Sequence, residues 1–134
     1  MTYALDTNII SYILQDREHI QKRVRETLLY GDDLIIPPIV YYEVRRGLLS
    51  KDAHKKNAAF EQMCSTFTVG KMTLAVFDEA AWQYAFLRHA GHSIDDADLL
   101  IAAFCIANDY TLVTNNVRHF DAINGLLFEN WLIP

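Results

Sequence analysis

Three acidic residues stand out because their positions suit the binding of a divalent metal ion. Asp6 directly follows the short apolar run 2–5, so its carboxylate is expected where a strand gives way to a helix. Glu43 lies within another predicted helix, and Asp98 lies at the start of a helix later in the chain. Taken singly, each has a plainer role: a helix cap for Asp6, a helix-dipole partner for Asp98 and a solvated acid for Glu43.

Considered together, the three acids are stronger evidence for a metal site than any one of them alone. The predicted order of strands and helices brings Asp6 and Asp98 to the carboxyl edge of one sheet, where sites of α/β proteins form. Carboxylates held within a few ångström need shared protons or a cation, and oxygen ligands without a His or Cys cluster suit Mg²⁺ or Mn²⁺. Such an ion can acidify a water and stabilise charge on a phosphate, so the pattern indicates metal-assisted phosphodiester hydrolysis.

Polar residues beside these acids have more than one possible role. Asp95 and Asp98 share a helix face while Asp96 points elsewhere, so one acid of this cluster could line a site and the others cap the helix. Asn115 and Asn116 end a predicted strand at the same sheet edge, and a polar turn is an equal alternative for the pair.

Other catalytic classes lack their motifs. The five histidines have no metal-ligand spacing, and the chain has neither a glycine-rich phosphate loop nor a nucleophile elbow. P-loop nucleotide hydrolysis and acyl transfer are therefore disfavoured. Cys64 and Cys105 lie among apolar residues at helical spacing, which favours buried reduced thiols and suits a cytoplasmic protein.

Short apolar strands alternate with helices along the chain. Strands are expected over residues 2–5, 34–36, 74–77 and 111–114, with one more at 126–128. Between them, helical spacing is expected to begin after Asp6, near residues 20, 39 and 59, at Asp78, and at Asp95. This alternation predicts an α/β fold whose mostly parallel sheet of four to five short strands is covered on both faces.

Length and composition bound the class of protein. We expect residues 1–134 to form a single domain, and a content of 51% hydrophobic and 22% charged residues is far from that of disordered chains. No apolar run approaches the roughly 20 residues of a membrane-spanning helix, and the N-terminus lacks signal-peptide features. A net charge of −5 argues against nucleic-acid binding through bulk positive charge, so any such activity must be local.

Four segments in order resemble the VapC-type PIN-domain toxins of type II toxin–antitoxin systems. They are 5–10, 44–47 after Glu43, 98–103, and 111–116 with Phe120 further on, and the likeness extends to 125–126 and 129–131. The resemblance implies a PIN-like three-layer α/β/α fold. It also implies a Mg²⁺-dependent endoribonuclease, with Mn²⁺ able to substitute, that cleaves tRNA, rRNA or mRNA with an activated water.

The resemblance also implies roles for single residues. Asp6 and Asp98 match the two principal metal-binding acids, and Glu43 matches an acid that helps position the metal or the attacking water. The fourth polar position of the catalytic set falls on Asn116, where many PIN domains have Asp, so the number of tightly held ions stays open. The residues expected to orient the acids by hydrogen bonds are Thr7, Asn8 and Thr114.

Partners follow from the same resemblance. It implies a cognate VapB-like antitoxin that blocks the site, an RNA substrate, and a homodimer in the cytoplasm. A basic side chain from the antitoxin tail is expected to enter the acidic pocket and displace the metal. Four arginines are candidates for phosphate contacts, with a solvated surface role at least as favoured for each: Arg45, Arg46, Arg88 and Arg118.

Two other functions stay open at this point. The missing fourth acid would suit a catalytically degenerate PIN fold that acts as a binding module. A phosphatase with Asp6 as covalent nucleophile would need a second Asp two residues on, where Asn8 stands, so it ranks below the other two.

Overall fold

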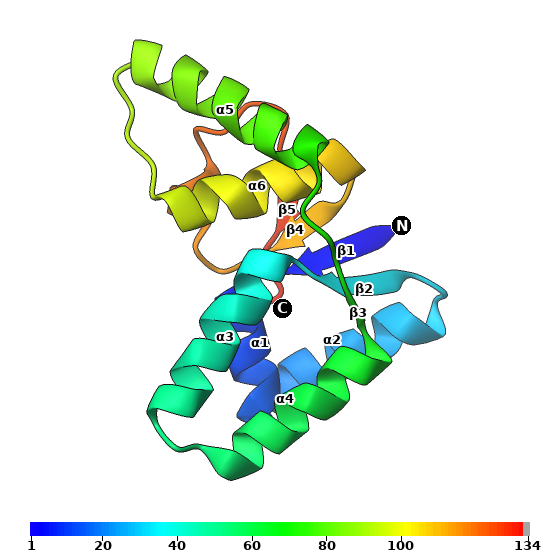
Figure 1. The fold of residues 1–134 in the computed structure, drawn as a ribbon. Coiled ribbons are helices and arrows are strands. Elements are labelled where there is room, and N and C mark those ends of the chain that lie inside the picture. The colour runs from blue at the N-terminus through cyan, green and yellow to red at the C-terminus, as the bar shows by residue number, and fades with distance from the viewer. Residues whose placement is uncertain (133–134) are drawn as a thin grey trace.

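The computed structural model describes residues 1–132, and its centre is a five-stranded sheet in the order β3-β2-β1-β4-β5 (Figure 1). Every neighbouring pair of strands is parallel. The strands are β1 (Thr2–Leu5), β2 (Asp33–Ile36), β3 (Thr68–Val69), β4 (Thr111–Val113) and β5 (Phe128–Glu129). The α/β fold with a parallel sheet is therefore confirmed.

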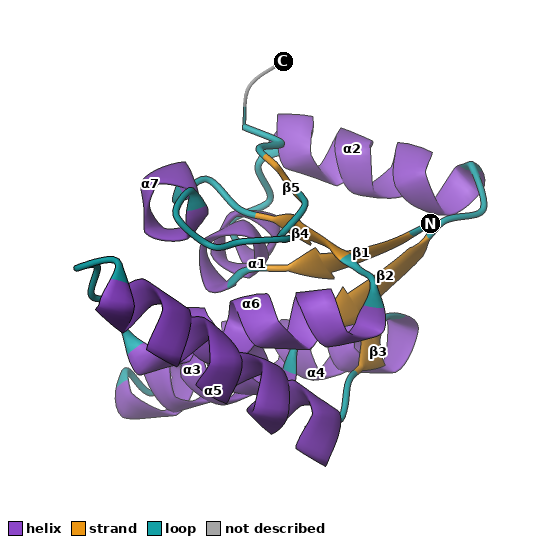
Figure 2. Cartoon of the chain, turned by 90° about the horizontal axis from the view of Figure 1, so that it is seen from above, coloured by secondary structure: helices purple, strands orange, loops and turns teal. Residues whose placement is uncertain are grey.

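Helices cover both faces of the sheet. Figure 2 shows α2 on one face and α6 on the other, with α5 packed outside α6. The α/β/α layering predicted from the sequence is thus present. The helices are α1 (Thr7–Leu14), α2 (Glu18–Leu29), α3 (Pro38–Ser50), α4 (His54–Thr66), α5 (Leu74–His89), α6 (Asp96–Asn108) and α7 (Val117–Phe120). Among these helices, none has the length and apolarity that crossing a bilayer requires.

Burial on both faces explains why the inner residues of the central strands are apolar. Ala4 and Leu5 of β1 and Leu112 and Val113 of β4 are fully buried, as expected for strands between two helical layers. The registers pair Leu5 with Val113, so β1 and β4 end side by side. Asp6 follows β1 directly at this shared end of the two strands.

The strand predicted at residues 74–77, with Asp78 as the cap of the next helix, is wrong. Helix α5 begins at Leu74 after Thr73, and the sheet is extended instead by β3, where Thr68 pairs with Ile35. Leu74 is 81% exposed, so the run 74–77 is not a buried strand. A run of four apolar residues does not distinguish a strand from a helix turn.

Candidate active site

Asp6 links the end of β1 to the start of α1. Its backbone N–H donates to the Val113 carbonyl at 2.9 Å, which continues the β1–β4 ladder by one residue. Its side chain caps α1 by accepting from the Thr7 N–H at 2.8 Å, and the residue is 4% exposed. The cap role is therefore real, and it fixes one carboxylate oxygen at the sheet edge.

The other carboxylate oxygen of Asp6 is held by side chains from two elements. Thr114 Oγ1 donates to Asp6 Oδ2 at 2.7 Å, and Asn8 Nδ2 donates to the same oxygen at 3.2 Å. Thr114 is itself fully buried at the end of β4. A carboxylate has about four acceptor positions. Three of those on Asp6 are used within residues 1–132, so the carboxylate is fixed and keeps one acceptor position.

Glu43 is joined to this network through one hydroxyl. Thr7 Oγ1 donates to Glu43 Oε1 at 2.9 Å, which ties the first turn of α1 to the middle of α3. Arg46, three residues later on α3, places Nη2 at 3.9 Å from Glu43 Oε2. The Glu43 side chain is 22% exposed, so it is accessible from solvent while Thr7 limits its rotation.

Asp98 lies in the first turn of α6 and faces α7. His119 Nδ1 lies 3.1 Å from Asp98 Oδ2, while the helix cap itself is provided by Asp95, whose carboxylate accepts from Ala97 N–H. Partial burial raises the pKa of Asp98, and the negative charges of Asp6 and Asp95 raise it further, against the lowering effect of His119. Asp6 thus lies close enough to Asp98 for its charge to disfavour ionisation of the Asp98 carboxyl.

These donors suit a magnesium site built on two carboxylates. Within residues 1–132, no three Asp, Glu, His or Cys side chains are grouped closely enough to hold one ion together, so a zinc-type centre has no support. Mg²⁺ keeps several waters and is commonly bound by one or two carboxylates together with substrate phosphates. Asp6 and Asp98 supply two such carboxylates, and Glu43 stands apart from them across Thr7.

The two asparagines after β4 have different contacts. Asn116 joins the network through its backbone, whose N–H donates to Thr114 Oγ1 at 3.0 Å. Asn115 donates from its backbone to Asn8 Oδ1 at 3.2 Å and from Nδ2 to the Tyr12 hydroxyl at 3.1 Å. Asn115 therefore supports the side chain that holds Asp6.

The sequence pattern predicts a surface or helix-end role for His119, so the contact with Asp98 is missed at that level. The two residues are 21 positions apart and meet only because α7 folds back on the start of α6. The sequence does place His119 in a short segment directly after the Asn115–Asn116 turn, at the same sheet edge as the acids. That position is the one feature of the sequence that could have indicated its contact with Asp98.

The four candidate arginines fall into two groups. Arg45 is held by Asn57 and Glu61 at 2.9 Å each, and Arg88 contacts Tyr84 on α5, so neither faces the acids. Arg46 lies beside Glu43, and Arg118 lines a hollow that also includes Asp98. Only Arg46 and Arg118 are placed where a phosphate near the acids could reach them.

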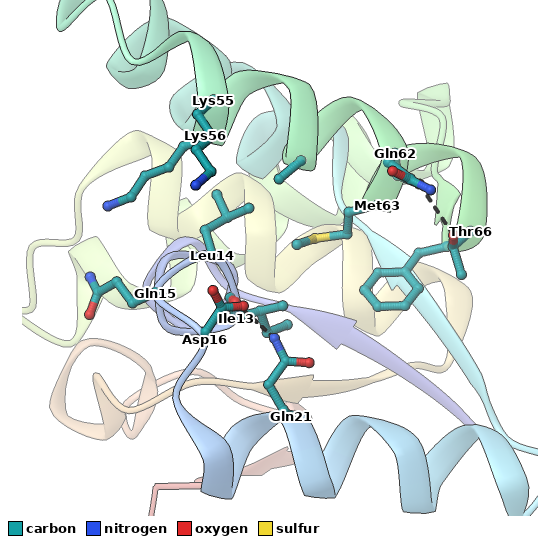
Figure 3. A pocket seen from close by; sticks show the side chains of 12 residues that line it. Ile13, Leu14, Gln15, Asp16, Gln21, Lys55, Lys56, Gln62, Met63 and Thr66 are labelled. Atoms are coloured by element: carbon teal, nitrogen blue, oxygen red, sulfur yellow. Dashed lines mark hydrogen bonds between the residues drawn. The ribbon is translucent and has the colours of Figure 1, made fainter.

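A groove of about 880 Å³ lies between α1, α2 and α4 (Figure 3). Figure 3 shows Met63 and two lysines of α4 facing Leu14 on α1, with Gln21 of α2 on the far side. A smaller hollow of about 310 Å³ continues from it to Thr7 and Glu43, and the two share Leu14, Gln15 and Lys56. The groove therefore leads toward Glu43 and includes none of the three candidate acids. The two lysines are Lys55 and Lys56.

Comparison with known proteins agrees with this architecture. The PIN domain family model matches residues 3–126. Ribonuclease VapC2 from Rickettsia felis is 35% identical, and the tRNA(fMet)-specific endonuclease VapC from Shigella flexneri is 26% identical, each over 98% of both chains.

Solved structures agree as well. The crystal structure of VapBC2 from Rickettsia felis bound to a promoter DNA fragment matches with a TM-score of 0.90 and 28% identity, and VapBC-1 from nontypeable Haemophilus influenzae with 0.87 and 28%. Both matches cover 98% of this chain and 99% of the other. On this evidence the chain belongs to the PIN-domain family, in its VapC group.

Proposed function

We propose that this chain is a Mg²⁺-dependent endoribonuclease that acts in the cytoplasm as the toxin of a type II toxin–antitoxin system. The observation that carries the proposal is the placement of Asp6 at the end of β1 and Asp98 at the start of α6, near enough that the charge of Asp6 contributes to the raised pKa of Asp98. Glu43 is attached to the same network through Thr7. Full-length relatives named as VapC ribonucleases support RNA as the substrate, and tRNA is one candidate.

Each acid has a distinct part in the proposed reaction. Asp6, fixed by its three donors, and Asp98, whose Oδ2 is held by His119, would hold the ion. When bound, Mg²⁺ supplies Lewis-acid stabilisation of the scissile phosphate and acidifies water. Glu43, limited in rotation by Thr7, would orient the attacking water and accept its proton.

Cleavage of a labelled tRNA pool in Mg²⁺ tests this function. We expect Asp6→Asn, Glu43→Gln and Asp98→Asn each to lower the rate by at least about a hundredfold, and EDTA to abolish it. Asp109→Asn is the matched control, because Asp109 is exposed in a left-handed conformation that Asn also adopts. Equal cleavage by all four variants would contradict the proposal. No cleavage by the unaltered chain, with no stabilisation by Mg²⁺, would favour the binding module.

We also propose that the α1–α2–α4 groove receives an apolar helical segment of a VapB-like antitoxin, with a basic side chain reaching the acids. Structural relatives solved as VapBC complexes support such a partner. Ala59 is exposed on α4 and lines the groove, whereas Ala58 is exposed and does not. We expect Ala59→Arg to cleave RNA normally but escape inhibition by the co-expressed antitoxin, and Ala58→Arg to remain inhibited. Inhibition of both variants alike would contradict this docking site.

A second copy of the chain is the partner we propose for α5. This helix is the outer layer beyond α6 and exposes several aromatic side chains, with the Trp82 and Phe86 rings stacked at 5.5 Å. This exposed, stacked pair suits an isologous contact between two copies. The exposed aromatic residues are Phe77, Trp82, Tyr84 and Phe86.

A further inference from the structure

A separate hollow of about 380 Å³ opens beside Asp98, away from the α1–α2–α4 groove, with which it shares no lining residue. Its apolar wall is formed by Leu87 of α5, which is 2% exposed, and by Ile123 after α7, which is 6% exposed. Asp98 belongs to this lining, so whatever occupies the hollow lies next to one of the proposed metal ligands.

Charged and aromatic side chains surround the opening of this hollow. His92 and His119 provide two imidazole rings, Arg118 a guanidinium and Asp121 a carboxylate, and all four residues are exposed. None of the ion pairs formed among residues 1–132 involves Arg118 or Asp121. A cation and an anion outside these ion pairs, together with the His92 ring, thus surround a small apolar wall, while His119 is held against Asp98.

The size and chemistry of the hollow favour a nucleotide over other ligands. Its volume lies at the lower end of the range for small-molecule sites, which suits one nucleoside. Single-stranded RNA is commonly recognised by splaying out a base, which stacks on His or other planar side chains. Arg118 is suited to a phosphate oxygen, and a carboxylate such as Asp121 accepts from an exocyclic amino group.

We propose that this hollow binds one unpaired nucleotide adjacent to the bond that is cut, with its base against His92 and the Leu87–Ile123 wall. Arg118 binds the phosphate of that nucleotide, and Asp121 selects bases that carry an amino group over uracil. This inference rests on the proposed ribonuclease function, and it adds a substrate subsite to it. Asp98 is the point at which the hollow and the proposed metal site meet.

The test uses a pool of RNA oligomers of random sequence, cleaved by the Mg²⁺-loaded chain and sequenced at the new ends. We expect the unaltered chain to disfavour uracil at one position flanking the cut. Asp121→Asn should relax that discrimination by about tenfold, and Arg118→Ala should raise KM by about tenfold with a smaller effect on kcat. The matched controls are Asp109→Asn and Arg25→Ala, both at exposed positions outside the hollow.

A binding measurement separates this inference from the function on which it rests. In the Asp6→Asn background without metal, fluorescence anisotropy of a labelled oligomer should show weaker binding when Arg118→Ala is added, and no change with Arg25→Ala. Cleavage by the unaltered chain, with base preference and affinity the same in all variants, would overturn the subsite alone. No RNA cleavage at all would overturn both. Normal cleavage by Arg118→Ala with lost antitoxin inhibition would assign the hollow to a protein, and the subsite would be wrong.

Discussion

The carboxylate of Asp98 is held in surroundings that disfavour its charge, which is a usual feature of functional sites. Burial and two neighbouring acids raise its pKa above the ordinary value. A carboxyl with a raised pKa in the folded state costs stability when ionised, and this cost disappears as the pH falls below the unfolded value of about 3.9. A bound divalent cation would offset the same cost.

Because the ionised Asp98 carboxylate costs stability, replacing it with a neutral amide in Asp98→Asn should stabilise the fold at neutral pH. In EDTA at pH 7.5 we expect the variant to melt about 2–4 °C above the unaltered chain, and the difference to vanish as the pH falls toward 4. Added Mg²⁺ should raise Tm for the unaltered chain and leave the variant unchanged. A variant that melts lower in EDTA at neutral pH would show that Asp98 is stabilising, against this account.

Cys105 offers a second test at the same scale. It is fully buried, and burial together with the charge of Asp6 raises the pKa of its thiol, while burial also raises that of the half-buried Cys64. Because the thiolate is the reactive form, a thiol reagent should modify Cys105 only after denaturation. Two fast-reacting thiols in the folded chain at pH 8 would contradict the packing of α6.

Single residues differ in how far the sequence predicts them. The position of Asp6 is predictable, because an acid directly after a strand lies at the sheet edge. The same position lets its carboxylate both cap α1 and face the candidate site. The Asp98–His119 contact depends on how α7 packs against α6, which is a tertiary event without a local pattern. The same holds for the Thr7 hydroxyl that reaches Glu43, 36 residues away.

At the scale of elements, helical spacing predicts α1, α2, α3, α4, α6 and most of α5, but the predicted start of α5 is four residues late and β3 is missed. The segment 74–77 is apolar both at exposed positions such as Leu74 and Phe77 and at the buried Val76, so its sequence favours a strand prediction. Strand β3 has only two residues, Thr68 and Val69, with one exposed and one half buried, so no alternation could identify it. Its presence depends on pairing with β2, which the sequence does not display.

Gly70, directly after β3, provides a prediction about element packing. A Cβ at this position would collide with the ring of Phe104, which is 2% exposed in the middle of α6. We expect Gly70→Ala to cost about 1–3 kcal/mol, seen as a Tm lower by roughly 4–12 °C. Gly47→Ala is the matched control, because a Cβ there meets nothing within 4 Å and the helix interior of α3 should gain up to about 1 kcal/mol. Equal Tm values for the two variants would contradict the close β3–α6 packing.

At the scale of the whole molecule, the acids are assembled from three separate parts of the chain. The parallel pairing of β1 with β4 brings Thr114 to Asp6, α3 brings Glu43 to Thr7, and α6 brings Asp98 within reach of the charge of Asp6. With a net charge of −5, the molecule has no general attraction for RNA. The proposed RNA substrate would therefore be bound through local cations such as Arg46 and Arg118.

Assembly gives a further prediction at this scale. If two copies meet through α5, the unaltered chain should sediment as a dimer, and Trp82→Glu, which places a charge at a 53% exposed residue beside Phe86, should sediment as a monomer with its fold intact. Tyr30→Glu, at an 86% exposed aromatic residue after α2, is the control and should stay dimeric. A monomeric unaltered chain at tens of micromolar would exclude the α5 interface.

The central claim is that Asp6 and Asp98 bind one divalent ion together. It is tested most directly by anomalous diffraction from crystals of the chain soaked in Mn²⁺. We expect one strong anomalous peak within bonding distance of both carboxylates, and its loss in Asp6→Asn crystals treated in the same way. A manganese peak elsewhere in the molecule, or no peak beside these two carboxylates at saturating Mn²⁺, would contradict the claim.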